Sequence, residues 1–422
     1  MEQSLFSGIR QLYSSQKGNP KVIEIRIRMR DLIDPAVLRT AVDTTMKRYP
    51  YFCVELQRKN GQYVFADNFR PVTVLHALHG AELNSEEANL HMISFAWYDD
   101  WIILDVFHGL TDGTGAYEII RTLLYYYCSE RYGLKMNREG IRLAGDEISE
   151  EEWIDPIEVA AELPTPDRHE MSKALNPVEA AGVQDDQDKT VYSIAIPEAE
   201  FMSFNVENNG SPATMVSLFL SRAIAKMYPD ATDTIRIAMC INQRVALHAP
   251  LAHHSLVGGA MLEYNEKIRN WPLNRQATAY RDMVFAQSRE EAVLAGASST
   301  KGLTQLLLSK KTDQERLGVA AYALSMTNTF VSASVSYVGK ANFKEAEKYI
   351  CDFRSLTTTS GGTLTLEMAA VNNRFTLDFI QPFSSPIYME AFLKELEEND
   401  ITYDVQDVMK LELPNIRLPW SE

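Results

Sequence analysis

The stretch WIILDVFHGLTDGTGAYEIIRTLLYYY, residues 101–127, joins an apolar strand to an apolar helix through a short turn. Side chains alternate along an extended strand, so His108 at its end faces one side and Phe107 faces the other. Gly109 and Gly113 bound the turn, and glycine permits the backbone angles of a sharp reversal. We therefore expect the imidazole of His108 to be held at a strand end beside a tight bend.

Asp112 stands where the expected helix begins. A carboxylate at that position accepts hydrogen bonds from unpaired amides and stabilises the helix by ~0.3–1 kcal/mol. A histidine at a strand end is also ordinary in a packed core. Spacing alone therefore leaves two interpretations of His108 and Asp112: a structural turn, or part of a catalytic site.

The composition indicates a globular protein with more than one core. The chain has 422 residues, 45% of them hydrophobic and 23% charged, which predicts two domains of about 150 to 220 residues. The formal net charge of −16 argues against a nucleic-acid partner, because phosphate binding requires clustered Lys and Arg. No apolar run approaches the ~18 residues of a membrane span, and the first residues lack the pattern of a signal peptide. We expect no membrane span and a cytoplasmic location.

Several other chemistries lack their sequence signatures. The four cysteines lie far apart, without paired spacing or a neighbouring histidine, so neither a disulfide framework nor a metal site is expected. The remaining histidines are not spaced as metal ligands. The G-x-S-x-G turn of a serine hydrolase is also missing.

The first part of the chain alternates strands and helices. Residues 21–30 alternate apolar and basic side chains, as in a strand with one solvated face. Asp34 followed by Pro35 is typical of a helix start. Hairpins are expected at 60–61, an Asn-Gly pair, and at 99–100, an Asp-Asp pair.

The second part of the chain also mixes strands and helices. We expect strands, hairpins and helices in the following order: a strand at 190–197, a helix at 213–228, a strand at 233–244, helices within 274–310, a strand at 327–339, a hairpin at 362–383 and a helix at 385–399. The acidic, proline-containing segment between the two parts shows no sustained hydrophobic periodicity, which predicts an exposed linker.

These patterns predict an α+β fold built from two lobes. We place an N-terminal lobe at 1–165, a crossover linker at 166–189 and a C-terminal lobe at 190–422. Each lobe would be a two-layer sandwich of helices on a sheet.

Three motifs resemble one family in the same order along the chain. FHGLTDG at 107–113 resembles the His-His-x-x-x-Asp-Gly signature of the acyltransferase superfamily, which includes chloramphenicol acetyltransferase, plant acyl-CoA-dependent transferases, alcohol acetyltransferases and condensation domains of nonribosomal peptide synthetases. INQR at 241–244 resembles the second motif, Asp or Asn, one residue, then Arg. VSYVGK at 335–340 is similar to a serine-containing strand that ends at glycine.

The resemblance implies two chloramphenicol acetyltransferase-like lobes with a tunnel at their interface. His108 matches the catalytic histidine, and Asp112 matches an aspartate that pairs with the arginine of the second motif, here Arg244. A carboxylate–guanidinium pair can be bidentate, which would hold the loop that orients the imidazole. Gly113 matches a glycine whose role is mainly structural.

The resemblance also implies the reaction. An acyl group would pass from a thioester, either acyl-CoA or an acyl-pantetheine on a carrier protein, to a hydroxyl or amine of a small-molecule acceptor. His108 would be the general base, with no covalent acyl-enzyme and no tightly bound cofactor. Ser334, Ser336 and Tyr337 are candidate oxyanion or substrate contacts, and no metal is expected.

The sequence departs from the family pattern at Phe107, where the first histidine would stand. We therefore expect an O-acyltransferase similar to bacterial alcohol acetyltransferases rather than a peptide-forming condensation domain. The alternative is a non-catalytic condensation-like protein that binds a carrier domain or a small ligand. The family implies a monomer, and an anionic donor would need local cations, for which Lys340 and Lys344 are candidates. A second His-His pair, in HHSLVGG at 253–259, has Gly258 where the aspartate should be, and we interpret it as structural.

Overall fold

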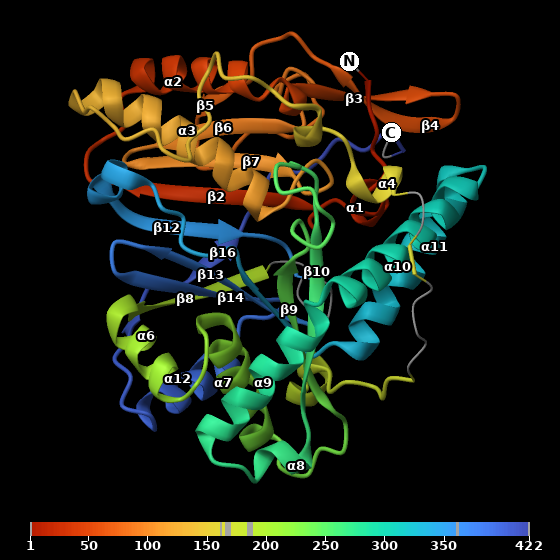
Figure 1. Ribbon diagram of the computed structural model, residues 1–422, viewed down its shortest axis with the longest axis vertical. Helices are drawn as coiled ribbons and strands as arrows, with labels where there is room; N and C mark the ends of the chain where they lie inside the picture. Colours follow the sequence, from red (N-terminus) through yellow and green to blue (C-terminus); the bar gives the residue numbers. More distant parts are fainter. Residues whose placement is uncertain (1, 161–162, 165–169, 184–188, 360–362, 421–422) are drawn as a thin grey trace.

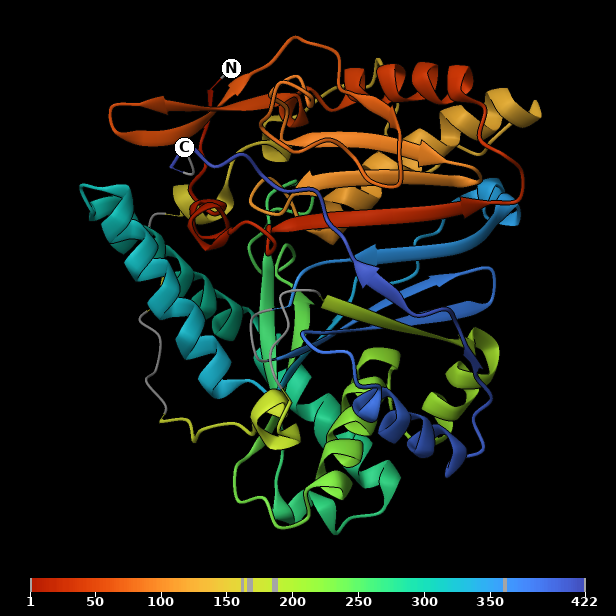
Figure 2. The same ribbon diagram turned by 180° about the vertical axis from the view of Figure 1, so that it is seen from behind.

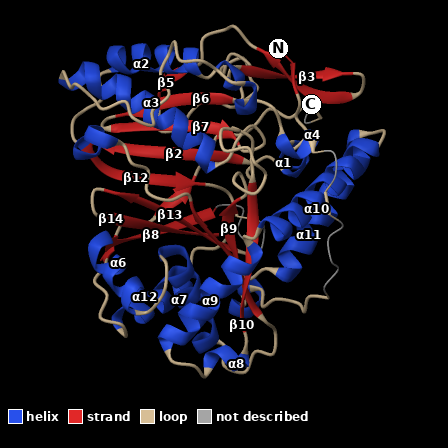
Figure 3. Ribbon diagram, viewed as in Figure 1, coloured by secondary structure: helices blue, strands red, loops and turns tan. Residues whose placement is uncertain are grey.

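The computed structural model describes residues 2–160, 163–164, 170–183, 189–359 and 363–420. One β-sheet occupies the upper half of the molecule in Figure 1 and a second sheet occupies the lower half. Helices cover the outer sides of both sheets (Figure 3). This is the mixed α/β architecture that the sequence predicted.

The upper sheet has the strand order β12-β2-β7-β6-β5. Its strands are β2 (Val22–Met29), β5 (Val74–His76), β6 (Ile93–Tyr98), β7 (Trp101–Phe107) and β12 (Ile350–Leu356). Helices α2 (Pro35–Arg48) and α3 (Gly113–Tyr132) pack together along this sheet. A small sheet of β1 (Glu2–Gln3), β4 (Gln62–Asp67) and β3 (Val54–Lys59) extends from the same half.

Local capping explains where the two helices begin and end. The Asp34 side chain accepts from the amides of Ala36 and Val37, and Pro35 takes the first position of α2. Asp112 accepts from the amide of Gly115 at the start of α3. Gly133 ends α3 with a left-handed φ of 62°, a conformation that glycine adopts without strain.

The lower sheet has the order β10-β9-β11-β13-β14-β8-β15, with β16 also on β8. Its strands are β8 (Lys189–Pro197), β9 (Ile235–Asn242), β10 (Val257–Tyr264), β11 (Ala333–Tyr337), β13 (Leu364–Val371), β14 (Arg374–Gln381), β15 (Asp404–Val405) and β16 (Met409–Leu411). The helices on its outer side are α6 (Glu198–Glu207), α7 (Pro212–Met227), α9 (Leu273–Gln287) and α12 (Ile387–Glu397). Short helices α4 (Pro156–Val159), α5 (Pro177–Ala181) and α8 (Glu266–Arg269) lie in the connections.

The two halves are interlocked by segments from the end of the chain. β12 runs antiparallel to β2, with Phe353 opposite Ile27. After α12 the chain climbs from the lower to the upper half (Figure 2), where the Leu83 amide donates to the Asn415 carbonyl. The division into lobes at 1–165 and 190–422 stays a prediction, and part of the proposed linker lies outside the described residues.

A helical hairpin of α10 (Glu290–Ser309) and α11 (Asp313–Phe330) projects from the lower half (Figure 1). The expectation of a strand over 327–339 was wrong at its start, because α11 continues to Phe330 and β11 covers only Ala333–Tyr337. Thr312 and Glu315 form a capping box that starts α11. A helix that is already nucleated extends at low cost, and this outweighs a weak local alternation. None of the helices in the described ranges combines the length and apolar character needed to cross a membrane.

We predict that the packing of β12 against the upper half stabilises the folded protein. Phe353 is fully buried and packs edge-on against Tyr117 of α3, with ring centroids 5.2 Å apart. Phe353→Ala should lower the free energy of unfolding by about 3–5 kcal/mol. Cys351→Ala, at an exposed position of the same strand, should change it by less than about 0.5 kcal/mol. Guanidinium unfolding followed by circular dichroism measures both; equal stability of the two variants would contradict the packing.

Candidate functional site

Two main-chain carbonyls position His108, one through its amide and one through its imidazole. β7 ends at Phe107, and the His108 amide donates to the Lys21 carbonyl at 2.8 Å. Nδ1 of His108 lies 3.0 Å from the Thr111 carbonyl. A carbonyl only accepts, so Nδ1 carries the proton and Nε2 of the neutral ring keeps its lone pair. Burial lowers the pKa of His108 below its ordinary value of 6.5, which keeps the ring neutral at neutral pH.

His108 borders a cavity of about 680 Å³ between the two halves of the molecule. The lower sheet supplies one wall through small polar side chains, and Ser334 and Ser336 point to it from alternate positions of β11. Ser336 lies opposite Glu367 of β13, which also borders the cavity. The helical hairpin α10–α11 closes another side with small residues such as Gly296.

Asp112 and Arg244 form a buried bidentate ion pair. Nη1 and Nη2 of Arg244 each donate to one carboxylate oxygen of Asp112 at 2.9 Å. The Leu256 amide donates to Asp112 at 2.9 Å, and Arg244 also donates to the carbonyls of Ala252 and His254. The turn after His108 is thereby joined to the loop that follows β9.

The second His-His pair belongs to this scaffold. The amide and Nδ1 of His253 lie 2.9 and 2.7 Å from the Glu152 carbonyl, while the His253 carbonyl accepts from the Thr111 hydroxyl at 2.7 Å. Burial, and then the neighbouring His254, lowers the pKa of His253 well below its ordinary value. His253 therefore lies behind the turn that follows His108 as a neutral side chain.

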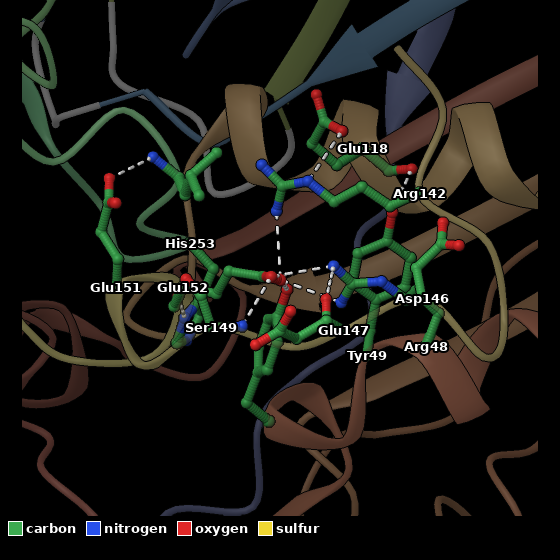
Figure 4. Close-up of polar contacts among 12 residues, drawn as sticks. Arg48, Tyr49, Glu118, Arg142, Asp146, Glu147, Ser149, Glu151, Glu152 and His253 are labelled. Carbon is green, nitrogen blue, oxygen red and sulfur yellow. Dashed lines mark hydrogen bonds and ion pairs between the residues drawn. The ribbon is translucent and has the colours of Figure 1, made fainter. Parts of the chain in front are cut away.

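Glu152 anchors the outer end of the scaffold, as Figure 4 shows. Arg48 donates to both oxygens of its carboxylate at 2.9 and 2.8 Å. Tyr51 donates to the same carboxylate at 2.7 Å, and Arg142 donates at 3.3 Å. Hydrogen bonds thus run without a break from this cluster through His253 and Thr111 to the ring of His108.

Sequence comparisons find no relative: no protein-family model and no curated protein sequence matches the chain. Solved structures do match. TRI101 of F. sporotrichioides complexed with coenzyme A and T-2 has a TM-score of 0.62 and 12% identity, covering 96% of this chain and 99% of that chain. Polyketide synthase associated protein 5 from Mycobacterium tuberculosis has a TM-score of 0.59 and 14% identity, covering 94% and 96%. The nonribosomal peptide synthetase FmoA3 has a TM-score of 0.56 and 12% identity, covering 94% of this chain but 43% of that chain.

The chain has the fold of the CoA-dependent acyltransferase and condensation-domain superfamily. The expectation of a chloramphenicol acetyltransferase-like fold is confirmed. At these identities the likeness concerns the fold, so the roles of individual residues rest on the geometry described above.

Phe107 stands where the family resemblance led us to expect a histidine. Its side chain is fully buried and packs against the ring of Phe65, with centroids 6.3 Å apart. A Cβ on Gly109 would approach Cε1 of Phe107 at 2.3 Å, so the turn folds directly over this ring. Phe107 is a core residue and does not border the cavity.

The predicted oxyanion or substrate contacts all border the cavity. Ser334, Ser336 and Tyr337 lie along one strand at the wall formed by the lower sheet. Burial raises the pKa of Tyr337 to about 12, so its hydroxyl keeps its proton and can donate. Their part in the reaction stays a prediction, as does that of Gly113, which packs against Val338, where a Cβ would meet Cγ2 at 2.5 Å.

The structure does not bring Lys340 and Lys344 to the cavity. Lys340 pairs with Glu198 at 3.1 Å, and neither lysine is among the residues that border the cavity. Gly339, between β11 and Lys340, has a φ of 104°. The expectation that these lysines supply cations for an anionic donor stays a prediction.

Three ionisable groups at the cavity were missed by the sequence analysis: Arg10, Lys21 and Glu367. Glu367 had a signal, because a carboxylate in the apolar run at 364–371 must be buried. Burial raises its pKa to about 7, although Ser336 and Thr357 donate to it. Arg10 and Lys21 had no such signal, since only the packing of α1 (Ile9–Ser14) and β2 in the tertiary structure brings them here. Within the described part of the chain, no group of three or more His, Cys, Asp or Glu could hold a metal ion.

We predict that Asp112→Asn destabilises the protein by about 3–5 kcal/mol, because it leaves the buried guanidinium of Arg244 without its counter-charge. Asparagine can still cap α3, so the loss would report the ion pair. Asp100→Asn removes the exposed pair with Arg28 and should cost less than about 1 kcal/mol. Urea unfolding of both variants measures the two losses in stability. An unfolding midpoint of Asp112→Asn equal to that of wild type would rule out a stabilising ion pair between Asp112 and Arg244.

Proposed function

We propose that the protein is an acyltransferase that moves an acyl group from a thioester donor to a hydroxyl or amine of a small-molecule acceptor. The observation that carries this proposal is His108: its Nδ1 is held by a carbonyl, its pKa is lowered, and it borders a large cavity. The fold adds support, since one structure that shares it is complexed with coenzyme A.

His108 would act as a general base and then as a general acid. Nε2 takes the proton from the acceptor as its oxygen or nitrogen attacks the thioester carbonyl. The tetrahedral intermediate collapses, the C–S bond breaks, and the imidazolium returns the proton to the thiolate. The products are an ester or amide and a free thiol, and no acyl-enzyme forms. A positioned base of this kind contributes about 10²- to 10⁴-fold in rate.

The oxyanion of the intermediate needs hydrogen-bond donors. The hydroxyls of Ser334, Ser336 and Tyr337 border the cavity and are the candidates. Removal of one such donor costs about 2.7–4 kcal/mol of transition-state stabilisation. Asp112 and Arg244 would contribute indirectly, by holding the turn that orients the imidazole.

The finer assignment is an O-acyltransferase similar to the alcohol acetyltransferases. Acyl-CoA and acyl-pantetheine on a carrier protein present the same thioester, so either donor suits the chemistry. Phe107 favours the second candidate, a non-catalytic condensation-like protein, because the first motif histidine is missing. Its burial in the core means that this change leaves the cavity wall intact, which supports the enzyme.

We predict that His108→Ala lowers thiol release by about 10²- to 10⁴-fold, the contribution of a general base. Acetyl-, butyryl- and octanoyl-CoA and their N-acetylcysteamine thioesters would be tested against a panel of alcohols and amines, with free thiol measured by a chromogenic disulfide. His76→Ala, at an exposed position of β5, is the control and should keep the wild-type rate. Equal thiol release by wild type and His108→Ala would show that His108 takes no part in the reaction. No thiol release by wild type would favour the second candidate, a non-catalytic condensation-like protein.

The pH profile provides a separate prediction. A base works only when unprotonated, and burial lowers the pKa of His108 below 6.5. kcat/KM should therefore stay constant as the pH falls through 6.5, and decline only below that value with the slope of one proton. Initial rates over pH 5 to 9 measure the profile. A decline centred above 6.5 would assign the base to another group.

A further inference from the structure

Two cations at the cavity have no carboxylate partner among the described residues. Arg10 belongs to α1 (Ile9–Ser14), and Lys21 directly precedes β2; both border the cavity. Among those residues the Arg10 guanidinium has neither an ion pair nor a hydrogen bond, and Nζ of Lys21 has only the Thr358 hydroxyl at 3.4 Å. The chain contains 57 Asp and Glu against 41 Lys and Arg, so carboxylates are not scarce. Arg244, by contrast, is fully paired.

Arg10 is exposed and Lys21 is half-buried at the edge of β2. Burial lowers the pKa of Lys21 to about 8, and the charges of Lys189 and Arg10 add to the effect. Two like charges in a partly desolvated cavity destabilise each other. A bound anion would offset the repulsion between the two positive charges.

Glu367 does not supply that counter-charge. It borders the same cavity, but its hydrogen bond goes to the Thr357 hydroxyl at 2.8 Å. Burial raises the pKa of Glu367 to about 7, which weakens its charge at neutral pH. Neither Arg10 nor Lys21 forms an ion pair with it in the described structure.

One of the two cations, Lys21, lies next to the proposed catalytic base. The Lys21 carbonyl accepts from the His108 amide, and the charge of Lys21 acts on the imidazole. A group bound by Lys21 would therefore lie close to the reacting atoms. The phosphates of coenzyme A are separated from its thioester by the long pantetheine arm, so they would lie elsewhere while the thioester reacts.

We propose that Arg10 and Lys21 form a subsite for a carboxylate carried by the acyl acceptor or by the acyl group. The guanidinium can bind both carboxylate oxygens, and the ammonium adds a compact charge. This inference rests on the proposed function, and it narrows the substrate class to hydroxy or amino acids, or to dicarboxylic acyl thioesters.

Selectivity between matched substrates tests the subsite. For the acceptor, 4-hydroxybenzoate and 3-hydroxybutyrate are compared with their amides, using acetyl-CoA. For the acyl group, succinyl-CoA is compared with butyryl-CoA, using a neutral alcohol. We expect wild type to prefer the carboxylate in one of the two comparisons. Arg10→Gln and Lys21→Met should each lower that kcat/KM ratio about 10-fold, as for loss of a hydrogen bond to a charged group.

Three further variants serve as controls. Arg10→Lys should restore part of the ratio because it keeps the charge. Lys47→Met, on the exposed side of α2, should leave both rates and the ratio unchanged. Asp112→Asn should lower both rates together, because a structural defect does not distinguish the two substrates.

The opposite outcomes are equally clear. A ratio unaffected by Arg10→Gln and Lys21→Met overturns the subsite, as does wild type that prefers the neutral member of every pair. A higher KM for acetyl-CoA in these variants, without a change for acetyl-N-acetylcysteamine, would assign the cations to the donor phosphates instead. If wild type releases no thiol at all, the proposed function fails. Calorimetric titration of 4-hydroxybenzoate and its amide into wild type and the double variant Arg10→Gln/Lys21→Met then decides the subsite by itself: equal binding of the two compounds overturns it.

Discussion

The ion pair between Asp112 and Arg244 is the constraint on which the site depends. It joins the turn after His108, in the upper half, to the loop after β9, in the lower half, through two hydrogen bonds of 2.9 Å. A buried pair is favourable only when its remaining donors and acceptors are satisfied. Here the Leu256 amide and the carbonyls of Ala252 and His254 satisfy them. The pair therefore sets the distance between the two halves at the place where the cavity opens.

Main-chain carbonyls, rather than side chains, position His108. Its main-chain amide donates to the Lys21 carbonyl and Nδ1 of its imidazole donates to the Thr111 carbonyl, while the Thr111 hydroxyl donates to the carbonyl of His253. A carbonyl contact tolerates almost any side chain at its residue. Solved structures at 12–14% identity share this fold.

The electrostatics of the cavity differ from those of the whole protein. The net charge is −16, yet the cavity has two cations and a carboxyl group whose pKa of about 7 leaves it only partly charged. Screening confines the effect of distant surface charges to about 8–10 Å. The groups that border the cavity therefore decide which substrates bind, and net charge is a poor guide to them.

The sequence by itself determined the local features, because short-range chemistry decides them. The caps at Asp34 and Gly133, the Asn-Gly hairpin at 60–61 and the turn around His108 all depend on neighbours in the chain. The Asp112–Arg244 pair could be expected only through resemblance to a family. Tertiary structure alone decided that β12 completes the upper sheet, that α11 replaces part of an expected strand, and that Arg10 and Lys21 rather than Lys340 and Lys344 reach the cavity. These depend on contacts between residues far apart in the chain, which periodicity and spacing do not encode.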